Sequence, residues 1–279
     1  MSATKVEIIC FTDPYCCWCW ATEPVLFRLR ETYREQISMR YVMGGLVKDM
    51  ATFHDASNDI SATAEVMPHW KMVGERTGQP IDERLMGDII DPHFSTWPAC
   101  RAVKAAQLQG NSIGEAYLRR MRRAALTERK YVSLPEVYID LAKQVASLDM
   151  EHFILSITDG TADQAFKDDM KECARYGARG FPTVMFQSGN ERLLANGYHS
   201  FDSYNRGVIQ LAPGIKTYQP RDFEALLIDY GPLTTRELAE ILVNPADTLR
   251  SGLETSLAEG SINKTPVPNG EFWSLAGQS

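Results

Sequence analysis

Two cysteines three residues apart, Cys16 and Cys19, lie between a short apolar run and a helical pattern near the N-terminus. Residues 6–11 are almost all apolar and predict a short buried strand. Residues 22–30 carry apolar side chains at helical spacing. Because Pro14 lies between the two patterns, we expect a strand, a tight loop and a helix that begins near Cys16.

The start of a helix is a favourable place for a reactive thiol. Unpaired backbone N–H groups and the helix dipole stabilise an anion there. Such a site lowers a thiol pKa from about 8.5 into the range of roughly 3.5–7.5. We therefore predict Cys16 as the nucleophile, and Cys19, one turn later, as the thiol that attacks the mixed disulfide formed at Cys16.

Zinc sites use the same cysteine spacing, so a soft-metal site of Cys16, Cys17 and Cys19 is a minor alternative. The five histidines are scattered, and none has a ligand-like spacing to another. We predict no metal and no cofactor.

The composition excludes several classes of partner. The chain has 279 residues and a net charge of −7, so neither nucleic acid nor an anionic membrane is an expected partner. No stretch approaches the ~20 apolar residues of a membrane span. Residues 1–5 lead into the first strand without a signal-peptide cleavage site. Six cysteines would suit a disulfide framework in a short secreted chain, but the length of this chain and the lack of a signal favour a reducing compartment and a catalytic pair, so we predict a cytoplasmic protein.

The order of patterns indicates an α/β protein with a helical insertion. A second strand at residues 37–43 ends at Gly44-Gly45, and residues 62–146 are mostly helical. A helix at 163–176, two short strands and a helix at 201–211 follow.

Several short motifs carry a resemblance to a known family. In order they are Cys16-Cys17-Trp18-Cys19-Trp20, Glu23-Pro24, Gly44-Gly45-Leu46, Ser95-Thr96-Trp97-Pro98-Ala99-Cys100-Arg101-Ala102 and Gly180-Phe181-Pro182-Thr183. Together they resemble the DsbA family of thioredoxin-like proteins, and within it the FrnE-like group of cytoplasmic disulfide isomerases.

The resemblance implies a thioredoxin-like domain over residues 1–212, with a helical insertion at about 48–160. It also implies thiol–disulfide oxidoreductase chemistry, with Pro182 as a cis-proline facing the cysteine pair. The backbone of Phe181 would then pair with an extended substrate. We expect Tyr15, Trp18 and Phe181 to contact that substrate.

The chain departs from the family at two cysteines. Cys17 fills the first variable position, so a Cys17–Cys19 pair or a nucleophilic Cys17 stays open. Thioredoxin and DsbA proteins carry a buried carboxylate six residues before the first active-site cysteine, where this chain has Cys10. We interpret Cys10 mainly as a small buried filler, with a role as an extra redox partner as the alternative.

Residues 221–279, the C-terminal module, have a different pattern. Three helices and a closing hairpin resemble a winged helix-turn-helix. From Asp222 onward there are three basic and nine acidic residues, a net of −6, which disfavours DNA. We predict a protein partner for the module, no part in the sulfur chemistry, and docking through Leu226, Leu227 and Phe272.

Three further predictions concern residues to which we assign no part in the sulfur chemistry. The run Arg119-Arg120 and Arg122-Arg123 is expected to be a solvated helix face. Cys100 and Cys173 are expected to be buried spectators. Trp20 is expected to pack in the interior.

The leading function is therefore a thiol–disulfide oxidoreductase or isomerase that acts on protein or peptide thiols and disulfides. A second class with this architecture comprises kappa-class glutathione transferases and 2-hydroxychromene-2-carboxylate isomerases, which carry serine where this chain has Cys16. A third is a binding protein, since some relatives with a similar Cys-x-Trp-Cys-Trp stretch are adaptors that deliver a redox regulator to a protease.

Overall fold

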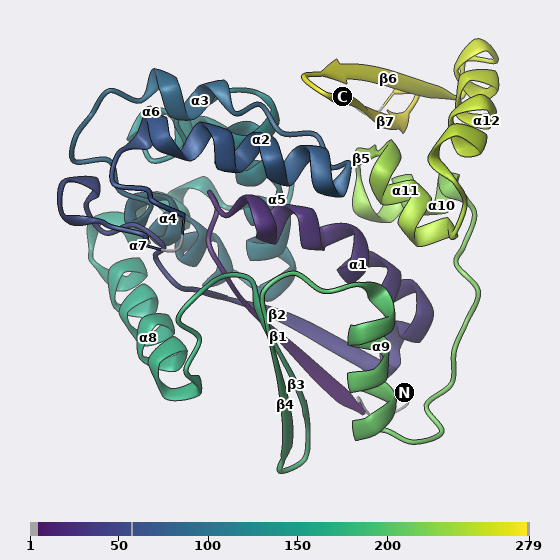
Figure 1. The fold of residues 1–279 in the computed structure, drawn as a ribbon, viewed down its shortest axis with the longest axis horizontal. Coiled ribbons are helices and arrows are strands. Elements are labelled where there is room, and N and C mark those ends of the chain that lie inside the picture. The colour runs from purple at the N-terminus through teal and green to yellow at the C-terminus, as the bar shows by residue number, and fades with distance from the viewer. Residues whose placement is uncertain (1–4, 57, 278–279) are drawn as a thin grey trace.

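The computed structural model describes residues 5–56 and 58–277. Residues 1–4, which contributed to our prediction that there is no secretory signal, lie outside that range. At the centre is a four-stranded sheet in the order β2-β1-β3-β4 (Figure 1). Its strands are β1 (Val6–Thr12), β2 (Ile37–Met43), β3 (Thr183–Ser188) and β4 (Glu191–Asn196). The β1–β2 pair is parallel, and the other two pairs are antiparallel.

Strand β1 is buried on both faces, which explains its nearly continuous apolar sequence. Ile8 and Cys10 point into the large core shared with α1 (Cys17–Tyr33) and α9 (Phe201–Leu211). Ile9 and Phe11 point to the opposite face, against Cys173 of α8 (Thr161–Tyr176). Helices therefore cover both faces of the sheet, and the predicted thioredoxin-like α/β fold is confirmed.

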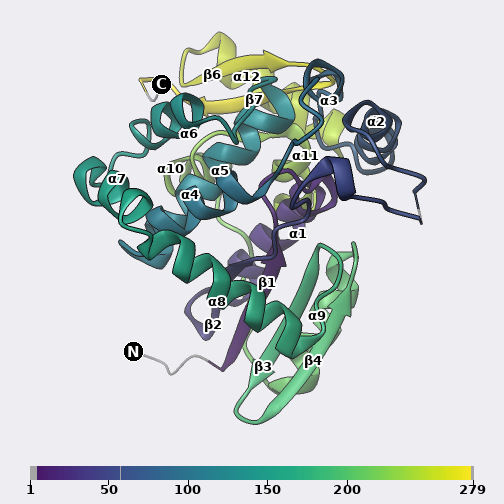
Figure 2. The same cartoon turned by 90° about the vertical axis from the view of Figure 1, so that its left-hand side faces the viewer.

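The predicted helical insertion lies between β2 and α8, beside the N-terminal end of α1 (Figure 2). Its helices are α2 (Val66–Thr77), α3 (Arg84–Asp88), α4 (Trp97–Gln107), α5 (Asn111–Thr127), α6 (Pro135–Ala142) and α7 (Met150–Thr158). Short 3-10 turns occur at η1 (Arg34–Gln36), η2 (Met50–Thr52) and η3 (Thr63–Glu65). Helix α4 packs on both α5 and α8, so the insertion is joined to the second half of the fold. Over residues 5–56 and 58–277, no helix combines the length and the apolar character needed to cross a membrane.

The C-terminal module contains the three predicted helices and the predicted hairpin. These are α10 (Phe223–Tyr230), α11 (Thr235–Leu242), α12 (Ala246–Ala258), β6 (Ile262–Val267) and β7 (Gly270–Leu275). A two-residue strand, β5 (Leu233–Thr234), adds to the hairpin in the order β5-β7-β6. Thr234 caps α11 in a reciprocal capping box with Glu237, which fixes the start of that helix.

The module packs directly on the face of α1 that carries Phe27, and α11 makes the main contact (Figure 1). Phe27 of α1 belongs to the module's apolar cluster together with Leu226 and Leu227, and its ring lies 4.7 Å from that of Tyr230. Phe272 instead joins the large core, beside Trp20. The three apolar residues expected to dock the module are thus all buried.

This packing leads to a prediction for stability. Phe27→Ala should destabilise the protein by about 3–5 kcal/mol, because a large aromatic side chain leaves a cavity between α1 and the module. Ile228→Ala, on the exposed face of α10, should change the free energy of unfolding by less than about 0.5 kcal/mol. Urea unfolding followed by circular dichroism compares the two, and equal small losses would contradict the packing described.

Candidate active site

Helix α1 begins immediately at the cysteine pair. Cys16 is the N-cap residue, and its Sγ accepts a hydrogen bond of 3.1 Å from the backbone N–H of Cys19. Cys16 and Cys19 form a disulfide, with Cα atoms 5.2 Å apart. The first turn contains no acidic residue, so the positive end of the helix dipole acts on the pair without a competing carboxylate in that turn.

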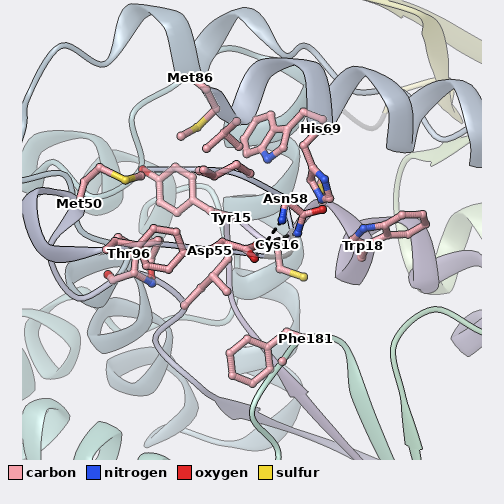
Figure 3. Close-up of a pocket in the computed structure, with 18 of the residues that line it drawn as sticks. Tyr15, Cys16, Trp18, Met50, Asp55, Asn58, His69, Met86, Thr96 and Phe181 are labelled. Atoms are coloured by element: carbon pink, nitrogen blue, oxygen red, sulfur yellow. Dashed lines mark hydrogen bonds between the residues drawn. The ribbon is translucent and has the colours of Figure 1, made fainter. Parts of the chain in front are cut away.

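Cys16 borders a cavity of about 550 Å³ between α1, the insertion and the loop before β3. Its sulfur points toward the space between Trp18 and Phe181 (Figure 3). The wall is part apolar and part polar, and its polar side chains include His54, Asp55, Asn58, His69, Thr96 and Arg179. The apolar lining includes Met50, Phe53, Ile60, Trp70, Met86 and Phe94. The site can therefore accept an apolar group beside the sulfur.

The structure brings the three expected substrate contacts to this cavity. Trp18 is partly exposed, 5.6 Å from the ring of Tyr198 and 6.3 Å from that of His69. Phe181 forms the opposite wall. Tyr15 is buried; its hydroxyl accepts a 3.0 Å hydrogen bond from the Ser133 N–H, so it lines the cavity and also anchors the loop.

Pro182 lies on the other side of the disulfide. The Phe181–Pro182 peptide bond is cis. Pro182 and Cys19 line a separate cavity of only about 10 Å³, behind the pair. The proline carbonyl accepts a 2.7 Å hydrogen bond from the Gly197 N–H, which joins the loop to the end of β4.

The four remaining cysteines are free thiols, and all are buried. Loss of solvation raises the pKa of Cys17 to about 12, and raises that of Cys10 to about 12 as well. Cys17 packs in the large core and also borders the cavity beside Cys16, and its raised pKa keeps this thiol neutral at physiological pH. Cys100 is buried, as expected, and its Sγ also donates a hydrogen bond of 3.3 Å to Asp13 Oδ2.

Asp13 lies three residues before Cys16, and sequence analysis assigned it no role. It is fully buried, which raises its pKa. It accepts hydrogen bonds from the backbone N–H groups of Tyr15 (2.9 Å) and Leu46 (2.7 Å) and from the Thr96 hydroxyl (2.7 Å). It therefore joins the active-site loop to the segment after β2 and to the start of α4. A carboxylate at the end of an apolar strand was the available signal.

The prediction that the arginine run is a solvated face is wrong, because none of its four members is exposed, and the side chains of Arg119 and Arg122 are less exposed than that of Arg120. Arg122 is only 1% exposed, and the side chain of Arg119 is 12% exposed. Arg122 Nη1 donates to Glu23 Oε1 at 2.6 Å, and Arg119 donates to the other oxygen of the same carboxylate. Residues three apart share one helix face, and this face of α5 meets α1 instead of water. The signal available was Glu23 within an apolar helix.

Within residues 5–56 and 58–277, no group of three or more His, Cys, Asp or Glu side chains could hold a metal ion. The arrangement at Cys16 and Cys19 instead provides a dithiol–disulfide couple at a helix start, open to a cavity on the Cys16 side.

Comparison with known proteins supports the fold. A family model described as Thioredoxin matches residues 9–206. The ClpXP adapter protein SpxH of Halalkalibacterium halodurans is 25% identical over 275 residues, covering 96% of this chain and 88% of its own. SpxH of Bacillus subtilis is 25% identical over 272 residues, with the same coverage. The structure of the cytosolic disulfide reductase DsbM from Pseudomonas aeruginosa has a TM-score of 0.58 and 22% identity, covering 74% of this chain and all of DsbM.

The buried carboxylate leads to a stability prediction. Asp13→Asn should destabilise the protein by about 1–3 kcal/mol, because the amide NH₂ group cannot accept the hydrogen bonds that one carboxylate oxygen accepts. Asp168→Asn, an exposed residue on α8, is the matched control and should change stability by less than about 0.5 kcal/mol. Thermal unfolding provides the measurement, and equal midpoints for the two variants would show that Asp13 does not hold the loop.

The thiol environments lead to a prediction for reactivity. In the reduced, folded protein, Cys16 should react with iodoacetamide at neutral pH, because its position at the helix start favours the thiolate. Cys17 should stay unlabelled until the pH approaches its pKa of about 12 or the chain unfolds. Mass spectrometry of labelled peptides measures both, and labelling of Cys17 in folded protein at pH 7 would overturn the assignment.

Proposed function

Because the chain belongs to the thioredoxin family, we propose that it is a thiol–disulfide oxidoreductase of protein or peptide substrates, with Cys16 as nucleophile and Cys19 as resolving thiol. The observation that supports this best is the position of Cys16. It is the N-cap of α1, its sulfur points to the cavity, and Cys19 is within bonding distance. The FrnE-like group and a cytoplasmic location are part of the same proposal.

In the reductive direction, the Cys16 thiolate attacks one sulfur of a substrate disulfide. A mixed disulfide forms, and the other substrate sulfur leaves as a thiolate that takes up a proton. The Cys19 thiolate then attacks Cys16 Sγ, which forms the Cys16–Cys19 disulfide and releases the second substrate thiolate. Two electrons pass to the substrate, and a thiol reductant must restore the dithiol. In an isomerase, another thiolate of the substrate would instead attack the substrate sulfur of the mixed disulfide. That attack would release the Cys16 thiolate and leave a rearranged substrate disulfide.

We assign substrate contact to Tyr15, Trp18 and Phe181, and a positioning role to Pro182. The apolar part of the wall suits an extended segment with an apolar side chain near its cysteine. A kappa-class transferase or a 2-hydroxychromene-2-carboxylate isomerase is less well supported, because those enzymes resemble this chain but have serine at the position of Cys16.

A second candidate function is an adapter. The similarity to SpxH proteins, which are named ClpXP adapters, covers 96% of this chain and so includes the C-terminal module. The similarity to DsbM covers 74%. We propose residues 1–212 and 221–279 as two units, the second of which contacts a protein partner and not nucleic acid.

Turnover measurements separate these functions. Cys16→Ser should reduce insulin-disulfide reduction to the uncatalysed rate, because no nucleophile remains. Cys17→Ala should keep most of the activity and is the matched control. An oxidoreductase role is excluded if the parent chain does not exceed the uncatalysed rate.

An adapter makes a different prediction for the same variants. The parent chain and Cys16→Ser should both accelerate degradation of at least one lysate protein by purified ClpXP, measured by quantitative mass spectrometry. If no protein is degraded faster, the adapter function fails.

A further inference from the structure

Four buried charged side chains form a continuous line from the C-terminal module to α1. Glu237 of α11 accepts hydrogen bonds of 2.9 Å from both terminal nitrogens of Arg119. Arg119 also donates to Glu23, whose other oxygen accepts a 2.6 Å hydrogen bond from Arg122. We call these four residues the charge chain.

One end of the charge chain lies behind the resolving cysteine. Arg122 and Cys19 line the same cavity of about 10 Å³, together with Thr12 and Pro182. Arg122 donates to Glu23 and Thr12, while its buried Nε has no hydrogen-bond partner. Glu23 follows Cys19 by one helical turn on α1. The Arg122 guanidinium, paired with the Glu23 carboxylate, thus borders the same small cavity as Cys19, whose thiol must become a thiolate.

The other end is fixed inside the C-terminal module. Glu237 is fully buried and also accepts hydrogen bonds from the Thr234 N–H (2.7 Å) and from Gln79 Nε2 (2.9 Å). The module therefore supplies one of the two negative charges that balance the two guanidinium groups. All four side chains are at most 12% exposed, so water screens a change in any one of these charges only weakly.

We propose that the charge chain sets the reduction potential of the Cys16–Cys19 pair, with Arg122 and Glu23 as positioning residues and Glu237 as the contribution of the C-terminal module. This proposal rests on the proposed oxidoreductase function. As the Cys19 thiolate attacks Cys16 Sγ, the Cys16–Cys19 bond forms and the bond from Cys16 to the substrate sulfur breaks. The substrate leaves as a thiolate that takes a proton from solvent, and Arg122 stabilises the attacking anion without giving up its own proton.

The proposal contradicts our sequence-based prediction that the module takes no part in the sulfur chemistry. Because a nearby cation stabilises a thiolate and a nearby anion destabilises it, removing Arg122 and removing Glu237 should have opposite effects on the Cys19 thiolate. A stabilised thiolate stabilises the reduced pair and raises its reduction potential. General damage to the fold would not give shifts of opposite sign.

The test is the equilibrium of the full chain with glutathione redox buffers, read by alkylation and mass spectrometry. Arg122→Met should favour the disulfide on the order of tenfold relative to the parent chain, about 30 mV more reducing. Glu237→Gln should shift the equilibrium in the opposite direction. Arg122→Lys keeps the charge and should stay close to the parent value.

The outcomes separate this proposal from the proposed function. Shifts of the same sign in Arg122→Met and Glu237→Gln, or no shift in either, would overturn it. If Arg122→Met does not fold, Glu237→Gln and Arg122→Lys still decide, because a parent-like Glu237→Gln or a strongly shifted Arg122→Lys contradicts the proposal. The chain's own dithiol is measured, so opposite shifts in a protein inactive on insulin would refute only the oxidoreductase function.

Discussion

Helix α1 is buried along almost its whole length, and this burial determines how the rest of the structure is arranged. Its first residues carry the cysteine pair, and apolar side chains such as Val25 and Leu29 pack in the core over the sheet. Phe27 faces the C-terminal module. A helix with neighbours on every side cannot shift without disturbing all of them, so the disulfide is held on a rigid element.

The burial of α1 also explains why the charged side chains beside it form ion pairs. Glu23 lies within the apolar helix, and an isolated carboxylate there would be costly. Arg119 and Arg122 of the insertion both pair with Glu23, and Glu237 of the module pairs with Arg119. The three parts of the chain therefore meet in one electrostatic unit.

Local patterns were enough to predict most elements. The alternation and apolar runs of residues 6–11 and 37–43 gave β1 and β2, and the periodicity of residues 163–176 gave nearly all of α8. The cysteine spacing correctly indicated a helix that starts at Cys16. The resemblance carried by the motifs predicted the thioredoxin-like fold, and it drew attention to Trp18 and Phe181, which border the cavity.

Sequence alone thus determined the strand–loop–helix unit with its cysteine pair, the helical insertion and the helices and hairpin of the C-terminal module. Only the tertiary structure decided which faces of these elements meet. Helical spacing shows that Arg119 and Arg122 share a face, but not that this face lies against Glu23. It likewise places Cys17 beside Cys16 without showing that Cys17 packs in the large core while the Cys16 sulfur points toward the cavity that both residues border. Burial and pKa depend on contacts between segments far apart in the chain, and local patterns carry no record of those contacts.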